Sequence, residues 1–141
     1  MKHSILIVDD NPETRSLLRL MLRPITGQVW EADNGSEALN QARQHRPDLI
    51  ILDFMMPDMS GVEVCAQLRQ ESSTATIPTI LLTARQDQRV IEAGRISGIT
   101  RFLFKPTSRQ ELLETTQEVL AVAPAKAPYF VPEAVHASSS A

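Results

Sequence analysis

The chain alternates short apolar runs with longer segments in which apolar residues recur at helical spacing. Three of the runs are continuously apolar, which is typical of strands buried on both faces of a parallel sheet. The run at 28–32 is weaker and suits the edge of such a sheet. We therefore expect five strands, at ILIV (5–8), QVWEA (28–32), LIIL (49–52), TILL (79–82) and RFLF (101–104).

Amphipathic helices are expected between these strands, and most have a recognisable start. Asn11 is a good N-cap residue, and Pro12 follows it at the first helical position. Ser60 and Ser108 each precede a glutamate by three residues, which is the spacing of a capping box. Five helices are therefore expected: after Asn11 with Leu17, Leu18, Met21 and Leu22 on one face, over 34–46, after Ser60, over 87–97 with Val90, Ile91 and Ile96, and after Ser108.

This fivefold alternation predicts an α/β fold with a parallel sheet covered by helices on both faces and right-handed crossovers. The expected architecture is a doubly wound, three-layer (βα)5 sandwich of flavodoxin-like type, with strand order 2-1-3-4-5. From Pro124 the chain is rich in Pro, Ala and Ser without any period. We therefore predict one domain over residues 1–122 and a flexible tail or linker over 123–141.

Composition narrows the classes of partner. The 141 residues carry a formal charge of −3 and a pI of about 5.6, so we expect no direct binding to nucleic acid or to an anionic membrane. No apolar stretch approaches the roughly 18 residues that span a bilayer. Cys65 is the single cysteine and lies among apolar residues, which favours a core position and a reducing compartment. We expect a cytoplasmic protein.

Chemically active side chains follow four of the predicted strands, at the edge where open α/β sheets bind ligands. Asp9 and Asp10 follow the first strand. Two carboxylates about 4 Å apart repel by roughly 4 kcal/mol at an effective dielectric near 20, so a cation is expected to offset them. Oxygen ligands alone favour Mg²⁺. The residues after the other strands are Asp53, then Thr83 with Ala84, and finally Lys105 with Pro106.

This set of side chains predicts phosphoryl chemistry. Asp53 is the candidate nucleophile, which would form an acyl phosphate. The Lys105 ammonium suits a phosphoryl oxygen and can pair with Asp53 beforehand, and the Thr83 hydroxyl offers another donor. Mg²⁺ and Lys105 would then stabilise the charge on the transferring group.

The same residues carry a family resemblance. DD (9–10), LDFMMPDMSG around Asp53, LTA (82–84) and KP (105–106) resemble the signature of response regulator receiver domains of two-component signalling, over about residues 4 to 122. The resemblance implies Mg²⁺-dependent transfer of a phosphoryl group from a sensor histidine kinase or phosphotransfer protein to Asp53. The face made by helix four, strand five and helix five would then change shape and control a downstream protein or output domain, with a phosphorylation-dependent dimer as one option. Such a domain is no enzyme beyond its own phosphorylation and autodephosphorylation.

The resemblance also implies a division of the metal site. Asp53 is similar to the phospho-acceptor, and Asp10 and Asp53 would bind Mg²⁺ directly. The backbone carbonyl of Met55 would supply a further ligand, whereas Asp9 would act mainly through water. Asp58, in the same loop, is expected to be a turn residue.

Further residues are matched on the phosphate side. The resemblance places Thr83, Ala84 and Lys105 at the phosphoryl oxygens, and Phe102 as an aromatic that turns inward when Thr83 moves. A buried phenylalanine without a switching role remains the alternative for Phe102. The bond before Pro106 is similar to one that is cis in the family. The resemblance also assigns the tuning of phosphate lifetime to Met55 and Arg85.

Two rival functions follow from the same residues. A Mg²⁺-dependent aspartyl-phosphate phosphohydrolase of the haloacid-dehalogenase type would need an aspartate where Met55 stands. A flavodoxin-like cofactor binder would need Gly, Ser or Thr in DDNPETR, which instead offers carboxylates.

The sequence leaves two points open. The domain is either a stand-alone receiver or part of a longer chain. One set of arginines marks either an output surface or a solvated helical face. That set is Arg89, Arg95, Arg101 and Arg109.

Overall fold

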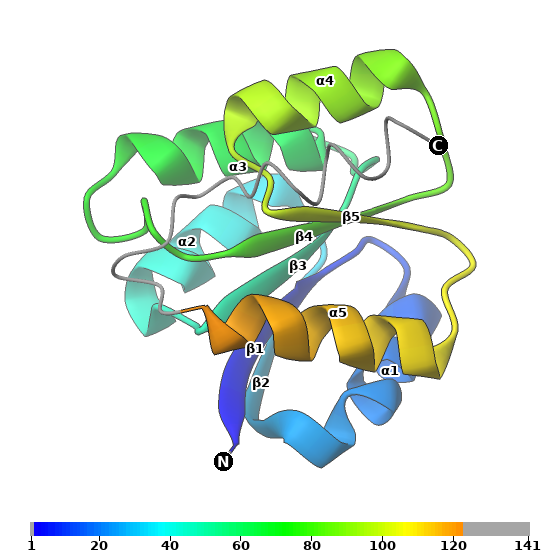
Figure 1. The fold of residues 1–141 in the computed structure, drawn as a ribbon. Coiled ribbons are helices and arrows are strands. Elements are labelled where there is room, and N and C mark those ends of the chain that lie inside the picture. The colour runs from blue at the N-terminus through cyan, green and yellow to red at the C-terminus, as the bar shows by residue number, and fades with distance from the viewer. Residues whose placement is uncertain (1, 123–141) are drawn as a thin grey trace.

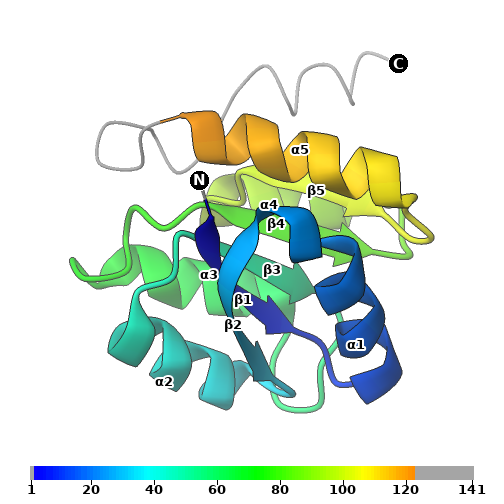
Figure 2. The same ribbon diagram turned by 90° about the horizontal axis from the view of Figure 1, so that it is seen from below.

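The computed structural model describes residues 2–122 and forms a five-stranded parallel sheet between two layers of helices (Figures 1 and 2). The predicted tail, 123–141, lies outside the described residues. The strand order is β2-β1-β3-β4-β5, so the expected fold class is confirmed and β2 lies at an edge. The strands are β1 (His3–Val8), β2 (Thr26–Ala32), β3 (Leu49–Asp53), β4 (Thr79–Thr83) and β5 (Arg101–Phe104).

The helices begin where their capping residues predict. Asn11 Oδ1 accepts the amides of Glu13 and Thr14 at 2.8 and 3.2 Å. Ser60 and Glu63 form the full capping box. One short 3₁₀ turn was not expected from the sequence, and Pro24 lies within it. The helices are α1 (Pro12–Met21), α2 (Gly35–His45), α3 (Gly61–Gln70), α4 (Gln88–Ser97) and α5 (Arg109–Ala121), with the 3₁₀ turn η1 (Arg23–Ile25) after α1.

The apolar strand residues divide between two cores, one on each face of the sheet. In β1, Ile5 and Ile7 pack toward α1 and α5, whereas Leu6 and Val8 pack with α2, α3 and α4. This division follows from the alternation of side chains along a strand. It explains why the central runs are apolar throughout: each successive residue meets a different layer of helices.

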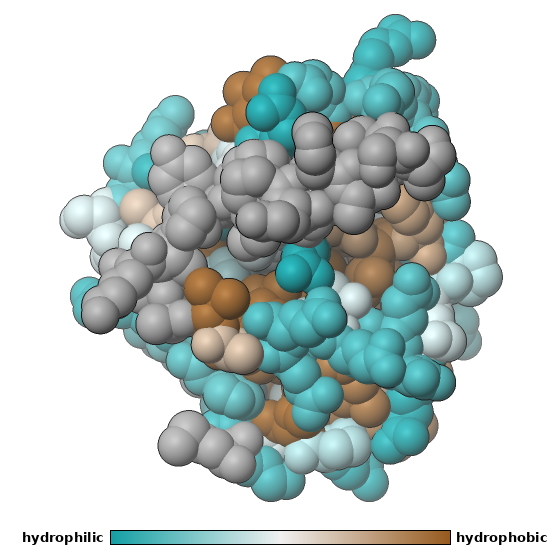
Figure 3. Space-filling model, in the orientation of Figure 1, coloured by the Kyte–Doolittle hydropathy of each residue, from teal (hydrophilic) through white to brown (hydrophobic). Residues whose placement is uncertain are grey.

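Some residues expected in the core are exposed. Leu17 on α1 is 51% exposed and Ile96 on α4 is 72% exposed, although both follow the apolar spacing of their helices. A hydrophobic spot lies over α4 at the top of the space-filling view (Figure 3). Cys65 is buried, as predicted. No helix within residues 2–122 is long and apolar enough to cross a bilayer.

Candidate functional site

Backbone hydrogen bonds bring the strand ends together at one edge of the sheet. The Asp9 amide donates to the Ala32 carbonyl at 3.1 Å, joining the ends of β1 and β2. The Phe54 amide donates to Leu82 at 3.1 Å, and the Lys105 amide donates to Thr83 at 2.9 Å. The residues that follow β1, β3, β4 and β5 therefore surround one site, as the sequence predicts.

Three carboxylates form the acidic part of this site. Oxygen atoms of Asp9, Asp10 and Asp53 all lie within 4.8 Å of one another. Asp9 is only 2% exposed, whereas Asp10 is exposed and the Asp53 side chain is 12% exposed. The donor set is entirely oxygen, one carboxylate faces solvent, and hard divalent cations prefer such ligands. These residues fit Mg²⁺.

Lys105 places one cation beside these carboxylates. Its Nζ donates to Asp53 Oδ1 at 2.8 Å and to Asp9 Oδ2 at 3.2 Å. Burial opposes the ammonium, but the hydrogen bonds and the charges of Asp53 and Asp9 outweigh burial and raise the pKa of Lys105. Lys105 therefore stays charged and joins two of the three carboxylates.

For Asp53, burial and the hydrogen bond from Lys105 act on the pKa in opposite directions. Burial raises the pKa of the Asp53 carboxyl, and the charges of Asp9 and Asp10 add to this effect. The hydrogen bond from Lys105 acts in the opposite direction without cancelling it. Ionisation of Asp53 in this acidic site is therefore unfavourable in free energy, and a further bound cation would offset that cost.

Asp9 is held at four of its atoms. Its amide donates to Ala32, and its carbonyl accepts a hydrogen bond from Arg15 Nη1 at 2.7 Å. Oδ1 accepts the Asn11 amide at 2.9 Å, and Oδ2 accepts from Lys105. Such a carboxylate has little freedom to reorient toward a ligand.

The end of β4 carries Thr83, Ala84 and Arg85. Thr83 is buried, and its Oγ1 accepts the Arg85 amide at 3.0 Å. Ala84 and Arg85 are exposed, and Arg85 pairs with Asp87, the N-cap of α4, at 3.2 Å. This turn leads from the site directly into α4.

Two glycines allow close packing around the site. A Cβ on Gly61, at the start of α3, would lie 2.4 Å from the backbone oxygen of Asp53. A Cβ on Gly94, in α4, would lie 2.8 Å from two ring atoms of Phe102. The ring of Phe102 is half-buried and packs on the α2–α4 side of the sheet.

The remaining predicted residues lie in the segments that follow β3 and β5 or take part in other contacts. Met55 is 64% exposed, and the Lys105–Pro106 peptide bond is cis. Asp58 caps α2, because its two carboxylate oxygens accept the amides of Gly35 and Ser36 at 2.8 and 2.9 Å. This contact agrees with a turn residue rather than a metal ligand. Among the arginines left open, Arg95 pairs with Glu92 and Arg101 pairs with Glu118.

Sequence reasoning missed Arg15 and Glu31. The two side chains pair at 2.8 Å between α1 and β2, and Arg15 also reaches the backbone of Asp9. The sequence holds only a faint signal of this, an arginine one turn into α1 and a lone glutamate in the edge strand. Nothing in the sequence alone brings the two together.

Comparisons with known proteins agree with this geometry. A family model described as response regulator receiver domain matches residues 5–117. Protein PilH of Pseudomonas aeruginosa is 36% identical over 117 residues, which cover 83% of this chain and 97% of that protein. The DNA-binding response regulator MtrA of Mycolicibacterium smegmatis is 37% identical over 113 residues, 80% of this chain, which spans only 48% of that relative.

A solved structure gives the same result. The chemotaxis protein CheY4 of Vibrio cholerae superimposes with a TM-score of 0.79 at 33% identity, covering 84% of this chain and 99% of that one. The family match covers most of the described residues, and the solved structure has the same fold. The chain therefore belongs to the response regulator receiver domains, the signalling modules of two-component systems.

Proposed function

We propose that the chain accepts a phosphoryl group on Asp53 and passes the signal on through a change in the face made by α4, β5 and α5. The observation that carries this proposal is Lys105 Nζ, which donates to Asp53 at 2.8 Å and to Asp9 at 3.2 Å beside the exposed Asp10. A nucleophile, a fixed cation and an acidic cluster thus meet at one edge of the sheet.

The transfer step follows from these groups. An oxygen of the Asp53 carboxylate attacks the phosphorus of a phosphohistidine on a kinase or phosphotransfer protein. The phosphorus–nitrogen bond breaks, and the imidazole nitrogen leaves with the electron pair and takes a proton from water. Lys105 follows the charge from the carboxylate to the phosphoryl oxygens, where an ammonium stabilises the transition state.

Receiver domains bind Mg²⁺ at an acidic pocket, and the carboxylate cluster of this pocket is present here. We propose Asp10, Asp53 and the backbone carbonyl of Met55 as direct ligands, with Asp9 acting through water. The burial of Asp9 and its four hydrogen bonds support its indirect role. When bound, Mg²⁺ would neutralise carboxylate charge and polarise a phosphoryl oxygen.

The response is proposed to begin at Thr83. A phosphoryl group adds a charge of about −1.5 to −2 at neutral pH and three acceptor oxygens. The Thr83 hydroxyl and the backbone at Ala84 can donate to those oxygens. We propose that Phe102 turns inward when Thr83 moves; its ring lies against Gly94 of α4. Met55 and Arg85, both exposed, are proposed to control access of attacking water.

A groove beside the site supports a protein donor. It lies between α1 and the segment after β5, measures about 450 Å³, and borders Lys105. Leu17, which is 51% exposed, and Met21 give it an apolar lining together with Pro106. An apolar groove next to the nucleophile suits the surface that carries a phosphohistidine better than it suits a small phosphate ester.

We propose no enzymatic turnover for this chain. Met55 occupies the position where a phosphohydrolase of the haloacid-dehalogenase type would place its general acid, and a thioether has no proton to donate. Steady hydrolysis of small phosphate esters over many turnovers would contradict this. We also propose residues 1–122 as the receiver unit, since the family match and every described helix and strand lie within that range.

The test uses acetyl phosphate with MgCl₂ and intact-mass spectrometry. Wild type is expected to gain one phosphoryl group, and Asp53→Asn is expected to gain none. Asp58→Asn is the matched control, because both Asp58 carboxylate oxygens are engaged in capping α2 and the substitution should leave the mass gain intact. A mass gain that survives Asp53→Asn would rule out Asp53 as the acceptor.

A further inference from the structure

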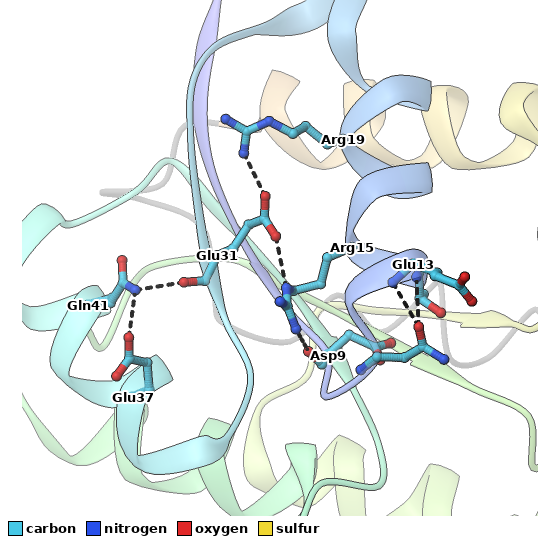
Figure 4. A network of polar contacts seen from close by, with 9 residues as sticks. Asp9, Glu13, Arg15, Arg19, Glu31, Glu37 and Gln41 are labelled. Atoms are coloured by element: carbon cyan, nitrogen blue, oxygen red, sulfur yellow. Dashed lines mark hydrogen bonds and ion pairs between the residues drawn. The ribbon is translucent and has the colours of Figure 1, made fainter.

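Arg15 connects the edge of the sheet with the backbone of the acidic site (Figure 4). It lies on α1, and its side chain is only 17% exposed. Nε donates to Glu31 Oε1 on β2 at 2.8 Å, and Nη1 donates to the Asp9 carbonyl at 2.7 Å. Both bonds are short and charge-assisted, so the guanidinium is held in one orientation.

The carbonyl that Arg15 contacts belongs to the peptide group between Asp9 and Asp10. A peptide group is planar, so fixing its oxygen also fixes the direction of the following amide and Cα. Asp10 itself is exposed, whereas Asp9 is buried and hydrogen-bonded at four of its atoms. The orientation of Asp10 therefore depends on its backbone, and Arg15 contacts that backbone directly.

Glu31 in turn holds Arg15. Its second carboxylate oxygen accepts from Arg19 Nη1 at 2.8 Å, and its backbone carbonyl accepts from Gln41 at 2.7 Å. Figure 4 shows the resulting chain of contacts from α2 through β2 to α1 and Asp9. Arg19 shares the same carboxylate but is 49% exposed, and its Nη1 donates to Glu31 Oε2 rather than to the Asp9 backbone.

We propose that Arg15 is a positioning residue that sets the affinity of the acidic site for Mg²⁺ by orienting Asp10 through the Asp9 carbonyl. This inference rests on the proposed Mg²⁺ site and goes beyond its ligands. A purely structural ion pair between α1 and β2 would make Arg15 and Arg19 equivalent, since both bind Glu31. A positioning role makes the two arginines different, because Arg15 contacts the Asp9 backbone and Arg19 does not.

The test titrates MgCl₂ into the apo protein by isothermal titration calorimetry. Arg15→Met keeps most of the aliphatic stem and removes both hydrogen bonds. Its Kd for Mg²⁺ is expected to rise about 10-fold, the lower end of the loss seen when partners outside the ligand shell are removed. Arg19→Met is the matched control, and its Kd should stay within about twofold of wild type, as for an exposed ion pair.

The possible outcomes are distinct. Equal Kd values for Arg15→Met and Arg19→Met, or a wild-type Kd for Arg15→Met, would overturn the inference. If Arg15→Met does not fold by far-UV circular dichroism, Arg15→Lys is compared with Arg19→Lys. The first is expected to bind Mg²⁺ more weakly, because one ammonium cannot reproduce the fork of a guanidinium, and equal binding would overturn the inference. Failure of wild type to bind Mg²⁺ would instead refute the proposed metal site.

Discussion

The ends of β1 and β4 both face the site, but they are built in opposite ways. At the end of β1, Asp9 is held through four atoms, and three of its partners lie in other elements: β2, α1 and the segment after β5. At the end of β4, the Thr83 carbonyl accepts the Lys105 amide, but the Thr83 side chain accepts its hydrogen bond from Arg85, within its own turn. Ala84 and Arg85 beyond it are exposed.

This contrast separates two tasks. Carboxylates that repel one another must be held together before any ligand arrives, and contacts from distant elements do this at the end of β1. A segment that responds to phosphate must instead change at low cost, and few long-range contacts make local rearrangement cheap. The β1 end is therefore the anchored part of the site, and the β4 end is the responsive part.

The largest expected effect concerns the two adjacent aspartates in the anchored part. Asp10→Asn should weaken Mg²⁺ binding by more than about 10-fold, because a direct ligand matters more than an outer partner. Asp9→Asn should weaken it less, since an amide oxygen can still accept the Asn11 hydrogen bond and Asp9 is proposed to act through water. Calorimetric titration with MgCl₂ measures both Kd values. Equal losses would refute the division of roles.

Gly61→Ala tests how closely α3 approaches Asp53. The new Cβ would lie 2.4 Å from the Asp53 backbone oxygen, which a backbone atom cannot readily avoid. We expect a loss of about 1–3 kcal/mol in the free energy of unfolding and slower phosphorylation by acetyl phosphate. Urea denaturation and intact-mass time courses measure these two effects. Gly27→Ala is the control, because its Cβ would meet a side-chain carbon of Lys2 at 3.1 Å; an equal loss there would contradict this explanation.

The pH dependence of stability tests the charge balance at Asp53. Its folded-state pKa is raised, first by burial, so the folded state favours the protonated form. Ionisation therefore removes stability as pH rises from the ordinary value of 3.8 through the folded value. Without Mg²⁺, Asp53→Asn should have a higher Tm than wild type at pH 7 and a similar Tm well below pH 3.8, where the carboxyl is protonated in both states. A lower Tm for Asp53→Asn at pH 7 would contradict the sign of the shift.

The smallest expected effect belongs to the responsive part. Gly94→Ala adds a Cβ 2.8 Å from the ring of Phe102, which can rotate away, while Ala gains up to about 1 kcal/mol over Gly in a helix. Overall stability should change by less than about 1 kcal/mol. The beryllofluoride-induced amide shifts in α4 and β5 should change, as measured by NMR, while the Kd for Mg²⁺ stays at its wild-type value. Unchanged shifts would argue against a switching role for Phe102.

Local features of the sequence were enough to predict the architecture. Continuous apolar runs predicted the three central strands, because alternate residues of each of them meet different helical layers. The two edge strands were predicted from the weaker runs at 28–32 and 101–104. Asn11, Ser60 and Ser108 predicted helix starts, because a capping side chain bonds amides only two or three residues away. The residues at the strand ends followed from parallel topology, and the comparisons place the chain in the receiver family.

The exceptions share one physical cause. Leu17 and Ile96 have helical spacing suited to the core, yet both are exposed, because spacing defines a face and only packing decides how far that face is covered.

By itself, the sequence determined which strands and α-helices form, where the helices begin and which chemical groups reach the functional edge, since these depend on neighbours along the chain. The tertiary structure alone decided that Asp9 is buried and Asp10 exposed, and that Gly61 lies against the backbone of Asp53. It also decided that Arg15 meets Glu31, 16 residues away, when β2 pairs with β1 in one register. Contacts between distant segments depend on that register and on the packing of helices over the sheet, and no local pattern encodes either.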